Sequence, residues 1–189
     1  MLKKILLGAI VGAVIAFAWS WASWGIMPWY RNVFKDFRNS EEVMCAIRSN
    51  APEDGVYSLP TCPNEWKGKA FDRWANQYTC GPIIFSAVKL GGEDPKMVKN
   101  FIVHFILLFI VAGLISYIII HIPGKVKYGE RLFFVAVIGL IISLMNAIPN
   151  WNWMHYPLDF TLISLMDGVI MWFLAGLGIA KFAHQKNRR

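Results

Sequence analysis

The sequence predicts an all-α membrane protein: a four-helix transmembrane bundle with a small α/β extracytoplasmic subdomain inserted between the first and second spans. Three observations lead to this fold class. The 189-residue chain is 56% hydrophobic and only 16% charged, whereas soluble domains are about 45–50% apolar and about 25% charged. It contains four long apolar runs, and one long, nearly neutral connection follows the first of them. This composition excludes a secreted soluble enzyme, a disordered chain and a nucleic-acid binder.

The four apolar runs are the expected transmembrane helices. A bilayer core about 30 Å thick requires roughly 20 apolar residues in a helix, because lipid offers no hydrogen-bond partner to an open backbone. The runs that meet this requirement cover residues 5–26, 101–120, 132–148 and 158–180. Lys3 and Lys4 before the first run also fit a signal peptide, but the run is longer than a signal sequence needs and tryptophans follow its small residues. We therefore expect a membrane anchor.

Prolines and glycines mark the expected turns between the spans. We expect Pro123 and Gly124 to turn the chain at one membrane face, and Pro149 and Pro157 to end and restart helices at the other. The domain organisation that follows is a first transmembrane helix over 1–26, the subdomain over 27–99, and three further transmembrane helices over 100–189.

The distribution of basic residues predicts the orientation. The connection between the first two spans carries ten basic and nine acidic residues and is nearly neutral, so most of the formal charge of +7 resides elsewhere. Four crossings place all remaining basic residues at one membrane face, which the positive-inside rule assigns to the cytoplasm. These residues are Lys3, Lys4, Lys125, Lys127, Arg131, Lys181, Lys186, Arg188 and Arg189. Both termini are therefore expected in the cytoplasm and the subdomain outside it.

The subdomain should contain several short elements. They are an interfacial amphipathic helix over 28–38, a short helix over 40–50, and two β-like runs over 55–60 and 82–88 that flank a polar insert over 64–79. Asn39 stands three residues before Glu42, which is a capping-box spacing. Asp94 followed by Pro95 predicts an N-cap and first helical residue, so the second span should begin above the membrane.

The three cysteines suggest one disulfide and one remaining thiol. Cys62 follows the first β-like run and Cys80 precedes the second, so antiparallel pairing of the runs would bring these thiols together. In an oxidising compartment they would form a disulfide. Cys45 would then be left over. The alternative is three free thiols.

Polar residues within the spans are the candidate functional residues, because they are costly in a bilayer. Asp167 lies near the middle of the fourth span, with Ser164 on the same helical face, while His104 and Asn146 lie in the outer halves of the second and third spans. A ligand or proton site centred on Asp167 is one interpretation. The other is an interhelical hydrogen-bond network that orders the bundle.

Tryptophans gather near the outer boundary, where an aromatic belt is common. Trp151 and Trp153 fall on more than one face and could line an aromatic cup for a hydrophobic ligand. The four histidines lack the spacing of haem or metal sites, so we expect no cofactor and no metal. In the first span, a stripe of small residues permits the close approach of another helix, from this chain or from a second subunit; its members are Gly8, Gly12, Ala16 and Ser20.

Several segments together resemble a widespread, uncharacterised group of small bacterial four-span inner-membrane proteins. They are WGIMPWY, NAPEDGVYSLP and CGPIIF in the first half of the chain, and PNWNWMHYPLDFTLISLMDGVIMWFLAGLGIA over 149–180. This resemblance implies the four-span topology and the bacterial inner membrane. It implies no activity and transfers no site residue.

Two function classes fit these observations, and the chain shows no catalytic motif for an enzyme. The first is an accessory or scaffold subunit that binds partners through its membrane helices and subdomain. The second is a small transporter, or a protein that binds lipid or another hydrophobic ligand, with an outward-facing polar cavity around Asp167. Expected partners are membrane lipid and either protein subunits or further copies of the chain, and nucleic acid is not among them.

Overall fold

The computed structural model describes residues 1–184, and the chain divides into two compact units. The first, Met1–Lys35 with Lys96–Arg189, is called the transmembrane unit here, and the second, Asp36–Pro95, is called the inserted unit. The basic residues Lys186, Arg188 and Arg189, which contribute to the predicted orientation, lie outside the described residues.

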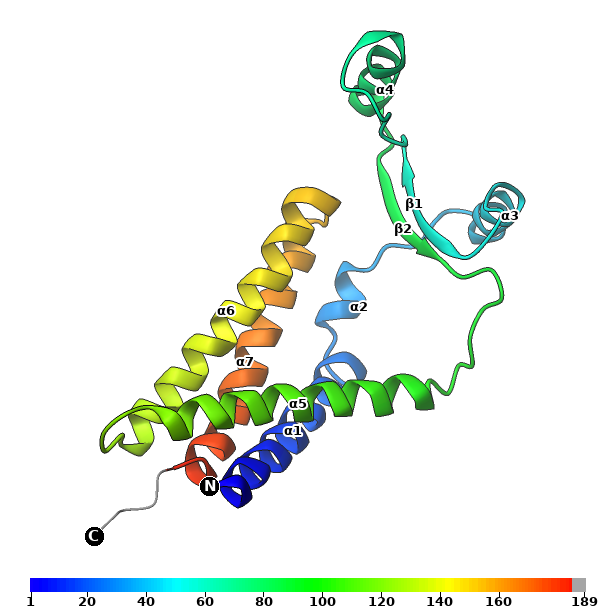
Figure 1. Cartoon of the computed structure of the whole chain (residues 1–189). Coiled ribbons are helices and arrows are strands. Elements are labelled where there is room, and N and C mark those ends of the chain that lie inside the picture. Colours follow the sequence, from blue (N-terminus) through cyan, green and yellow to red (C-terminus); the bar gives the residue numbers. More distant parts are fainter. Residues whose placement is uncertain (185–189) are drawn as a thin grey trace. The chain divides into compact units, whose positions relative to one another are not determined.

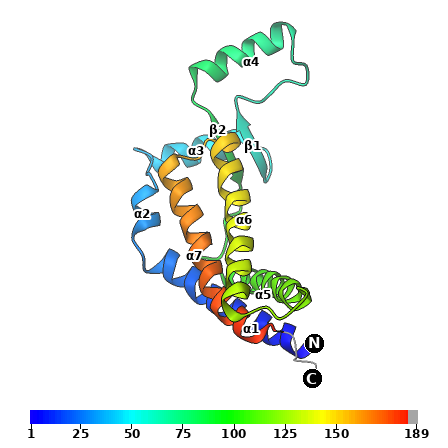
Figure 2. The ribbon, with the colours of Figure 1, turned by 90° about the vertical axis from the view of Figure 1, so that its left-hand side faces the viewer.

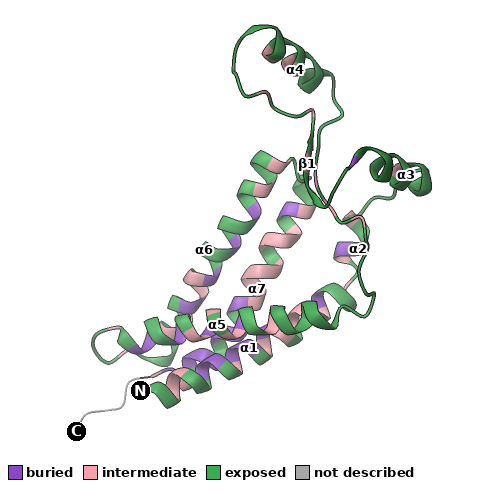
Figure 3. Ribbon diagram, turned by 45° about the vertical axis from the view of Figure 1, so that its right-hand side comes forward, coloured by how far each residue is buried: buried purple, intermediate pink, exposed green. Residues whose placement is uncertain are grey.

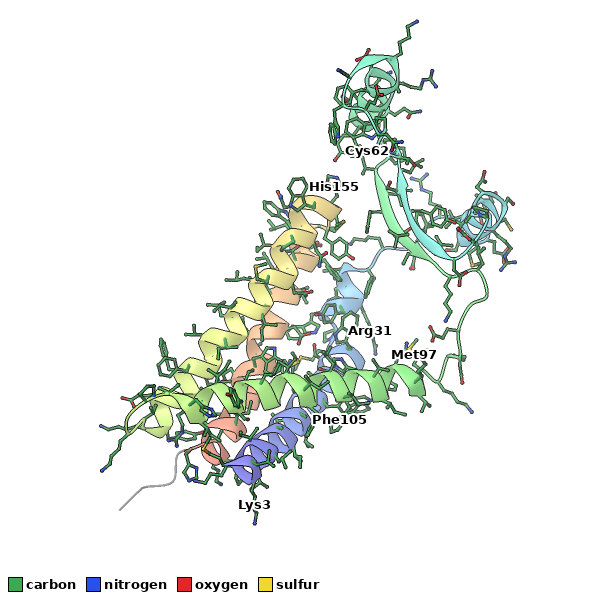
Figure 4. The ribbon with its side chains drawn as sticks, in the orientation of Figure 1. Lys3, Arg31, Cys62, Met97, Phe105 and His155 are labelled. Atoms are coloured by element: carbon green, nitrogen blue, oxygen red, sulfur yellow. The ribbon has the colours of Figure 1, made fainter. Side chains whose placement is uncertain are left out.

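Among the described residues, four helices are long and apolar enough to cross a membrane. They are α1 (Leu2–Gly25), α5 (Val98–His121), α6 (Tyr128–Met154) and α7 (Leu158–Phe182). Each contains one of the apolar runs of the sequence, so the four predicted helices are confirmed. Lys3 and His155 lie at opposite ends of this unit (Figure 4).

The four helices pack in the order α5, α1, α7, α6 (Figure 1). α1 lies along both α5 and α7, and α6 lies along α7, whereas α5 and α6 diverge from the connection that joins them (Figure 2). Small residues and a few large ones fill the core, among them Ala13, Ala112, Ile115, Trp172 and Ile179. The outward helix surfaces carry exposed apolar side chains, as helices in lipid require.

Small residues of α1 allow its close packing. Gly12 is buried, and a β-carbon there would lie 2.7 Å from Ile179 Cγ1 of α7 and 3.0 Å from Ala112 Cβ of α5. Gly8 likewise faces Ser116, whose hydroxyl is buried and has no hydrogen-bond partner among residues 1–184. The stripe formed by Gly8, Gly12 and Ala16 therefore packs against helices of the same chain.

Two proline-based boundary predictions are wrong. α6 continues through Pro149 to Met154, although the proline removes one N–H hydrogen bond and crowds the carbonyl group of the preceding turn, a cost that the helix bears near its end. α5 begins at Val98 rather than at Pro95, because Met97 adopts a left-handed backbone (φ 52°) that separates the helix from the preceding turn. Pro157, in contrast, is the N-cap residue of α7, as its predicted role in restarting a helix requires.

The predicted helix over 28–38 is also too long. Only α2 (Trp29–Val33) is helical, and Phe34 is already extended, with ψ at 137°. α2 packs against α7, and the Tyr30 side chain is 3% exposed. Tyr30 is therefore buried against a long apolar helix, whereas Phe34 and Phe37 remain 59% and 65% exposed, so the segment does not form one continuous amphipathic helix.

The inserted unit contains short elements with little core. They are α3 (Ser40–Asn50), β1 (Gly55–Leu59), α4 (Gly68–Cys80) and β2 (Ile84–Val88). β1 and β2 pair antiparallel, with Gly55 opposite Val88 and Leu59 opposite Ile84, which confirms the predicted two-strand element. The Asn39 side chain accepts a hydrogen bond from the Glu42 N–H at 3.2 Å, as the capping-box spacing predicts.

Candidate functional site

The Asp167 carboxyl group joins three helices. Its Oδ1 accepts a hydrogen bond from Trp19 Nε1 of α1 at 2.7 Å, and its Oδ2 accepts one from the Tyr30 hydroxyl of α2 at 2.9 Å. Both carboxyl oxygens therefore accept hydrogen bonds from side chains of other elements. We call these three residues, with Ser164, the Asp167 network.

The spacing of residues on α7 explains why Tyr30 reaches this carboxyl group. Phe160, Ser164 and Asp167 follow one another at helical intervals, so they lie on one face. The Tyr30 ring contacts Phe160 edge-on at 6.0 Å, and the Trp24 ring stacks on its other side at 3.9 Å. The Ser164 side chain lies close enough to the Tyr30 hydroxyl to lower the pKa of the phenol, against the larger effects of burial and Asp167. The phenol is thus held between two aromatic rings and two polar groups.

Burial of Tyr30 and the neighbouring Asp167 carboxyl group raise the pKa of the Tyr30 phenol well above its ordinary value. Burial is the larger cause, because a phenolate would lose its hydration there. The phenol therefore remains protonated at neutral pH and acts as the donor to Asp167. Trp19 Nε1 can only donate. The Asp167 network is consequently built around a carboxyl group that accepts two hydrogen bonds.

A second cluster of polar side chains is centred on Ser20, the residue that follows Trp19 on α1. His104 Nε2 of α5 is 3.3 Å from Ser20 Oγ, which lies 3.0 Å from the Ala16 carbonyl oxygen and 3.4 Å from Met171 Sδ. These side chains are half-buried, and the Phe17 ring packs against the His104 ring at 6.1 Å. The label of Phe105 in Figure 4, the residue after His104, shows the part of α5 from which His104 comes. Ser20 therefore links α1 to both α5 and α7.

The predicted site residues fall into separate places. Asp167 and Ser164 belong to the Asp167 network, whereas His104 belongs to the group at Ser20. Asn146 is exposed on α6, and its side chain makes no hydrogen bond with residues 1–184. Trp151 and Trp153, in the last turns of α6, are 46% and 73% exposed and contact no other ring in the described part of the chain.

The sequence analysis missed the two donors to Asp167. Trp19 belongs to the tryptophans near the outer end of the first span, and Tyr30 belongs to the amphipathic segment that follows it. The Trp19 indole N–H and the Tyr30 hydroxyl could have been identified as donors to Asp167 only by knowing that the chain reverses direction after α1. Pro28, which precedes α2, is the one local signal of that reversal.

The predicted Cys62–Cys80 disulfide is absent, and Cys45, Cys62 and Cys80 are all free, exposed thiols. The strand pairing on which the prediction depended is correct. However, Cys80 is the last residue of α4, and its Sγ lies 3.9 Å from Asn76 Oδ1 one turn earlier, while Cys62 Sγ lies 3.6 Å from the Pro63 carbonyl oxygen. Each thiol therefore lies near a partner in its own segment, Cys80 in the last turn of α4 and Cys62 in the loop before α4, and not near the other thiol.

The inserted unit exposes most of its apolar side chains. Ala51 is its one buried hydrophobic residue, and α3, α4 and β1 are coloured almost throughout as exposed (Figure 3). On and before α4, four aromatic rings follow one another at centroid distances of 5.0–5.9 Å. They belong to Trp66, Phe71, Trp74 and Tyr78. Trp66 is 69% exposed and Tyr78 37%, whereas Phe71 and Trp74 are half-buried, so these rings form a partly exposed aromatic cluster.

Comparisons with known proteins assign no relative to this chain. No protein-family model matches it, and searches of curated proteins and of solved structures also give no match. Within residues 1–184, no three His, Cys, Asp or Glu side chains are grouped so that they could hold a metal ion.

Proposed function

We propose that the protein is an accessory or scaffold subunit of a membrane assembly, which binds partner proteins through its inserted unit and its membrane helices. The observation that carries this proposal is the lack of a core in the inserted unit. Its large apolar side chains remain exposed although this unit contains none of the transmembrane helices; they include Met44, Val56, Leu59, Trp66, Ile84 and Phe85.

Such a unit needs a partner surface for stability. A two-stranded hairpin is marginally stable in water unless a further strand or helix covers one of its faces. Large exposed apolar surfaces on folded proteins mark sites of interaction. Val56 and Leu59 of β1 are 66% and 55% exposed, and Phe85 of β2 is 48% exposed. A bound protein would bury these side chains and supply the stability that the unit lacks.

The Asp167 network supports the same proposal. A transport or proton site needs a polar group that is available to its cargo, whereas both Asp167 oxygens accept hydrogen bonds from within the chain. Those bonds join α7 to α1 and α2 and thereby hold the helices in one arrangement. The carboxyl group is in this proposal a structural element of the scaffold.

One observation favours the alternative of a small transporter or hydrophobic-ligand-binding protein. His104, Ser20 and Met171 are only half-buried, in a unit whose α5 and α6 helices diverge. A ligand seated against these side chains would complete their burial. This function predicts a bound small molecule rather than a bound protein.

Native mass spectrometry of the protein, extracted in mild detergent at endogenous expression, separates the two functions. The expected result is a complex heavier than the 21.5 kDa chain by the mass of at least one other protein subunit, in a fixed ratio. A chain that carries only a small molecule would support the alternative. Uncomplexed chain without any ligand would contradict both proposals.

We infer that the protein resides in the bacterial inner membrane with both termini in the cytoplasm. This orientation is supported by the gathering of basic residues at one end of the transmembrane unit. Lys4 Nζ donates to the His184 carbonyl oxygen at 2.9 Å, and Arg131 Nε donates to the Ala180 carbonyl oxygen at 2.8 Å. The starts of α1 and α6 therefore meet the end of α7, as the positive-inside rule requires of basic residues on one face.

Cysteine labelling in intact cells tests the orientation. Cys62 should react with a membrane-impermeant maleimide added from outside, because it is exposed in the inserted unit. In a background without native cysteines, Lys127→Cys should react only after the membrane is opened. The reverse pattern would place the inserted unit in the cytoplasm.

A further inference from the structure

An open hollow of about 540 Å³ lies at the connection between α5 and α6. It is formed by the end of α5, the connecting residues and the first two turns of α6. This is the end of the transmembrane unit that carries Lys3 and Lys4, because α1 and α5 run antiparallel, with Gly8 against Ser116. The hollow is therefore at one boundary of the membrane, away from the Asp167 network.

Two kinds of surface meet in this hollow. Ile122, Val126, Phe133 and Phe134 supply apolar walls, and Lys125 supplies a cationic group at the rim. Phe133 is 63% exposed and Phe134 is 41% exposed. Both rings lie on α6, farther into its apolar stretch than Lys125 in the preceding connection, so in a membrane they would be placed to contact hydrocarbon chains.

The charged groups around the hollow are not equally available. Arg131 donates through Nη1 to the Val126 carbonyl oxygen at 2.6 Å and through Nε to α7, so its guanidinium is engaged with backbone groups. The Glu130 carboxylate accepts the Lys127 N–H at 2.6 Å. The Lys125 ammonium makes no hydrogen bond or ion pair with residues 1–184. Lys125 is the basic residue that lines the hollow, and its ammonium group is free to bind an anion.

We propose that this hollow binds an anionic phospholipid of the surrounding membrane, with the headgroup phosphate at Lys125 and the acyl chains against Phe133 and Phe134. Basic pockets between transmembrane helices at a membrane face are suited to such headgroups. A free phosphate ion would use the lysine but leave the phenyl rings exposed. The pairing of a cation with an apolar wall therefore specifies a lipid.

Lipid titration of the full-length protein, followed by native mass spectrometry, tests this site. The probes are phosphatidylglycerol and phosphatidylcholine with identical acyl chains. Phosphatidylglycerol should bind the wild type at least about fivefold more tightly, since one lysine near a lipid surface contributes about that factor. Lys125→Gln should reduce phosphatidylglycerol affinity about fivefold and leave phosphatidylcholine binding unchanged. Phe133→Ser should weaken binding of both lipids.

The matched control is Lys99→Gln, which removes an exposed lysine at the other end of α5 and should not change either affinity. Inorganic phosphate at the same concentration should not displace phosphatidylglycerol. Equal binding of the two lipids by the wild type would overturn the proposal. So would an equal loss of affinity in Lys99→Gln, or displacement by inorganic phosphate. Because Lys125 is exposed, Lys125→Gln should unfold at the wild-type temperature. The preference of the wild type for phosphatidylglycerol over phosphatidylcholine tests the proposal independently of any variant.

Discussion

Replacing Gly139 by alanine should destabilise the protein by about 1–3 kcal/mol, the usual cost of forcing an extra group into a packed core. Gly139 is buried where α6 crosses α7, and an added β-carbon would collide with Trp172 Cβ and lie 3.1 Å from Trp172 Cγ. Trp172 is itself 3% exposed. Its β-carbon is fixed to the α7 backbone, so rotation of the side chain cannot relieve the collision. The two helices would have to separate.

Thermal unfolding in detergent, followed by circular dichroism, measures this effect. Gly129→Ala is the matched control, because Gly129 lies on the same helix and an added β-carbon there meets no atom within 4 Å. Alanine is a better helix former than glycine by up to about 1 kcal/mol, so the control should be neutral or slightly stabilising. Equal unfolding temperatures for the two variants would show that α6 and α7 do not approach closely at Gly139.

The close approach of α6 and α7 depends on glycines from both helices. A β-carbon at Gly168 of α7 would lie 2.5 Å from Ser143 Oγ, and one at Gly176 would lie 3.0 Å from Val135 Cγ1. The sequence analysis identified the small-residue stripe of the first span, where four members recur at regular intervals. It did not identify this second interface, although Gly139, Ser143 and Ala147 recur at every fourth residue of α6 and are all buried, with the same spacing as the stripe of the first span.

Helices and strands were predictable wherever one local signal determined them. The apolar runs determined α1, α5, α6 and α7, and the two β-like runs determined β1 and β2. Boundaries failed where tertiary packing outweighed local preference. Pro149 remains inside α6, and α2 ends after five residues because Tyr30 is buried against α7. α4 was not predicted as a helix, although Phe71, Trp74 and Tyr78 recur at helical spacing.

The candidate site was only partly predictable for a different reason. The cost of a carboxyl group in a bilayer identifies Asp167 and requires that it have partners. Which partners it has depends on how α1 and α2 lie against α7, and the sequence does not contain those positions. Of the three polar residues grouped with Asp167 from sequence alone, Ser164 is the one in the Asp167 network, through Tyr30. His104 instead pairs with Ser20, and Asn146 faces away.

Replacement of Asp167 should therefore depend on the hydrogen-bonding capacity of the new side chain. In Asp167→Asn, the amide oxygen can still accept from Trp19 Nε1, and the amide nitrogen can donate to the Tyr30 oxygen. The unfolding temperature should remain close to that of the wild type. In Asp167→Leu, the indole N–H loses its acceptor within the helix packing. A buried polar group left unsatisfied costs about 1–3 kcal/mol, so this variant should unfold several degrees earlier.

Asp159 provides the matched control for the same two substitutions on the same helix. Its side chain is exposed, and its Oδ1 accepts only the N–H of the adjacent Phe160 at 2.8 Å. Asp159→Asn and Asp159→Leu should both change the free energy of unfolding by less than about 1 kcal/mol, the usual value of a charge at an exposed helix N-terminus.

A double-mutant cycle with Tyr30→Phe then assigns the loss to the network. Once the phenol is absent, Asp167→Leu no longer removes the hydrogen bond at Oδ2, so the combined loss should be smaller than the sum of the single losses. Additive losses would mean that Tyr30 and Asp167 act independently. Equal tolerance of asparagine and leucine at position 167 would go further, because it would show that neither Trp19 nor Tyr30 relies on this carboxyl group. The helices would then be held together by the apolar core and the glycine contacts, without a contribution from this carboxyl group.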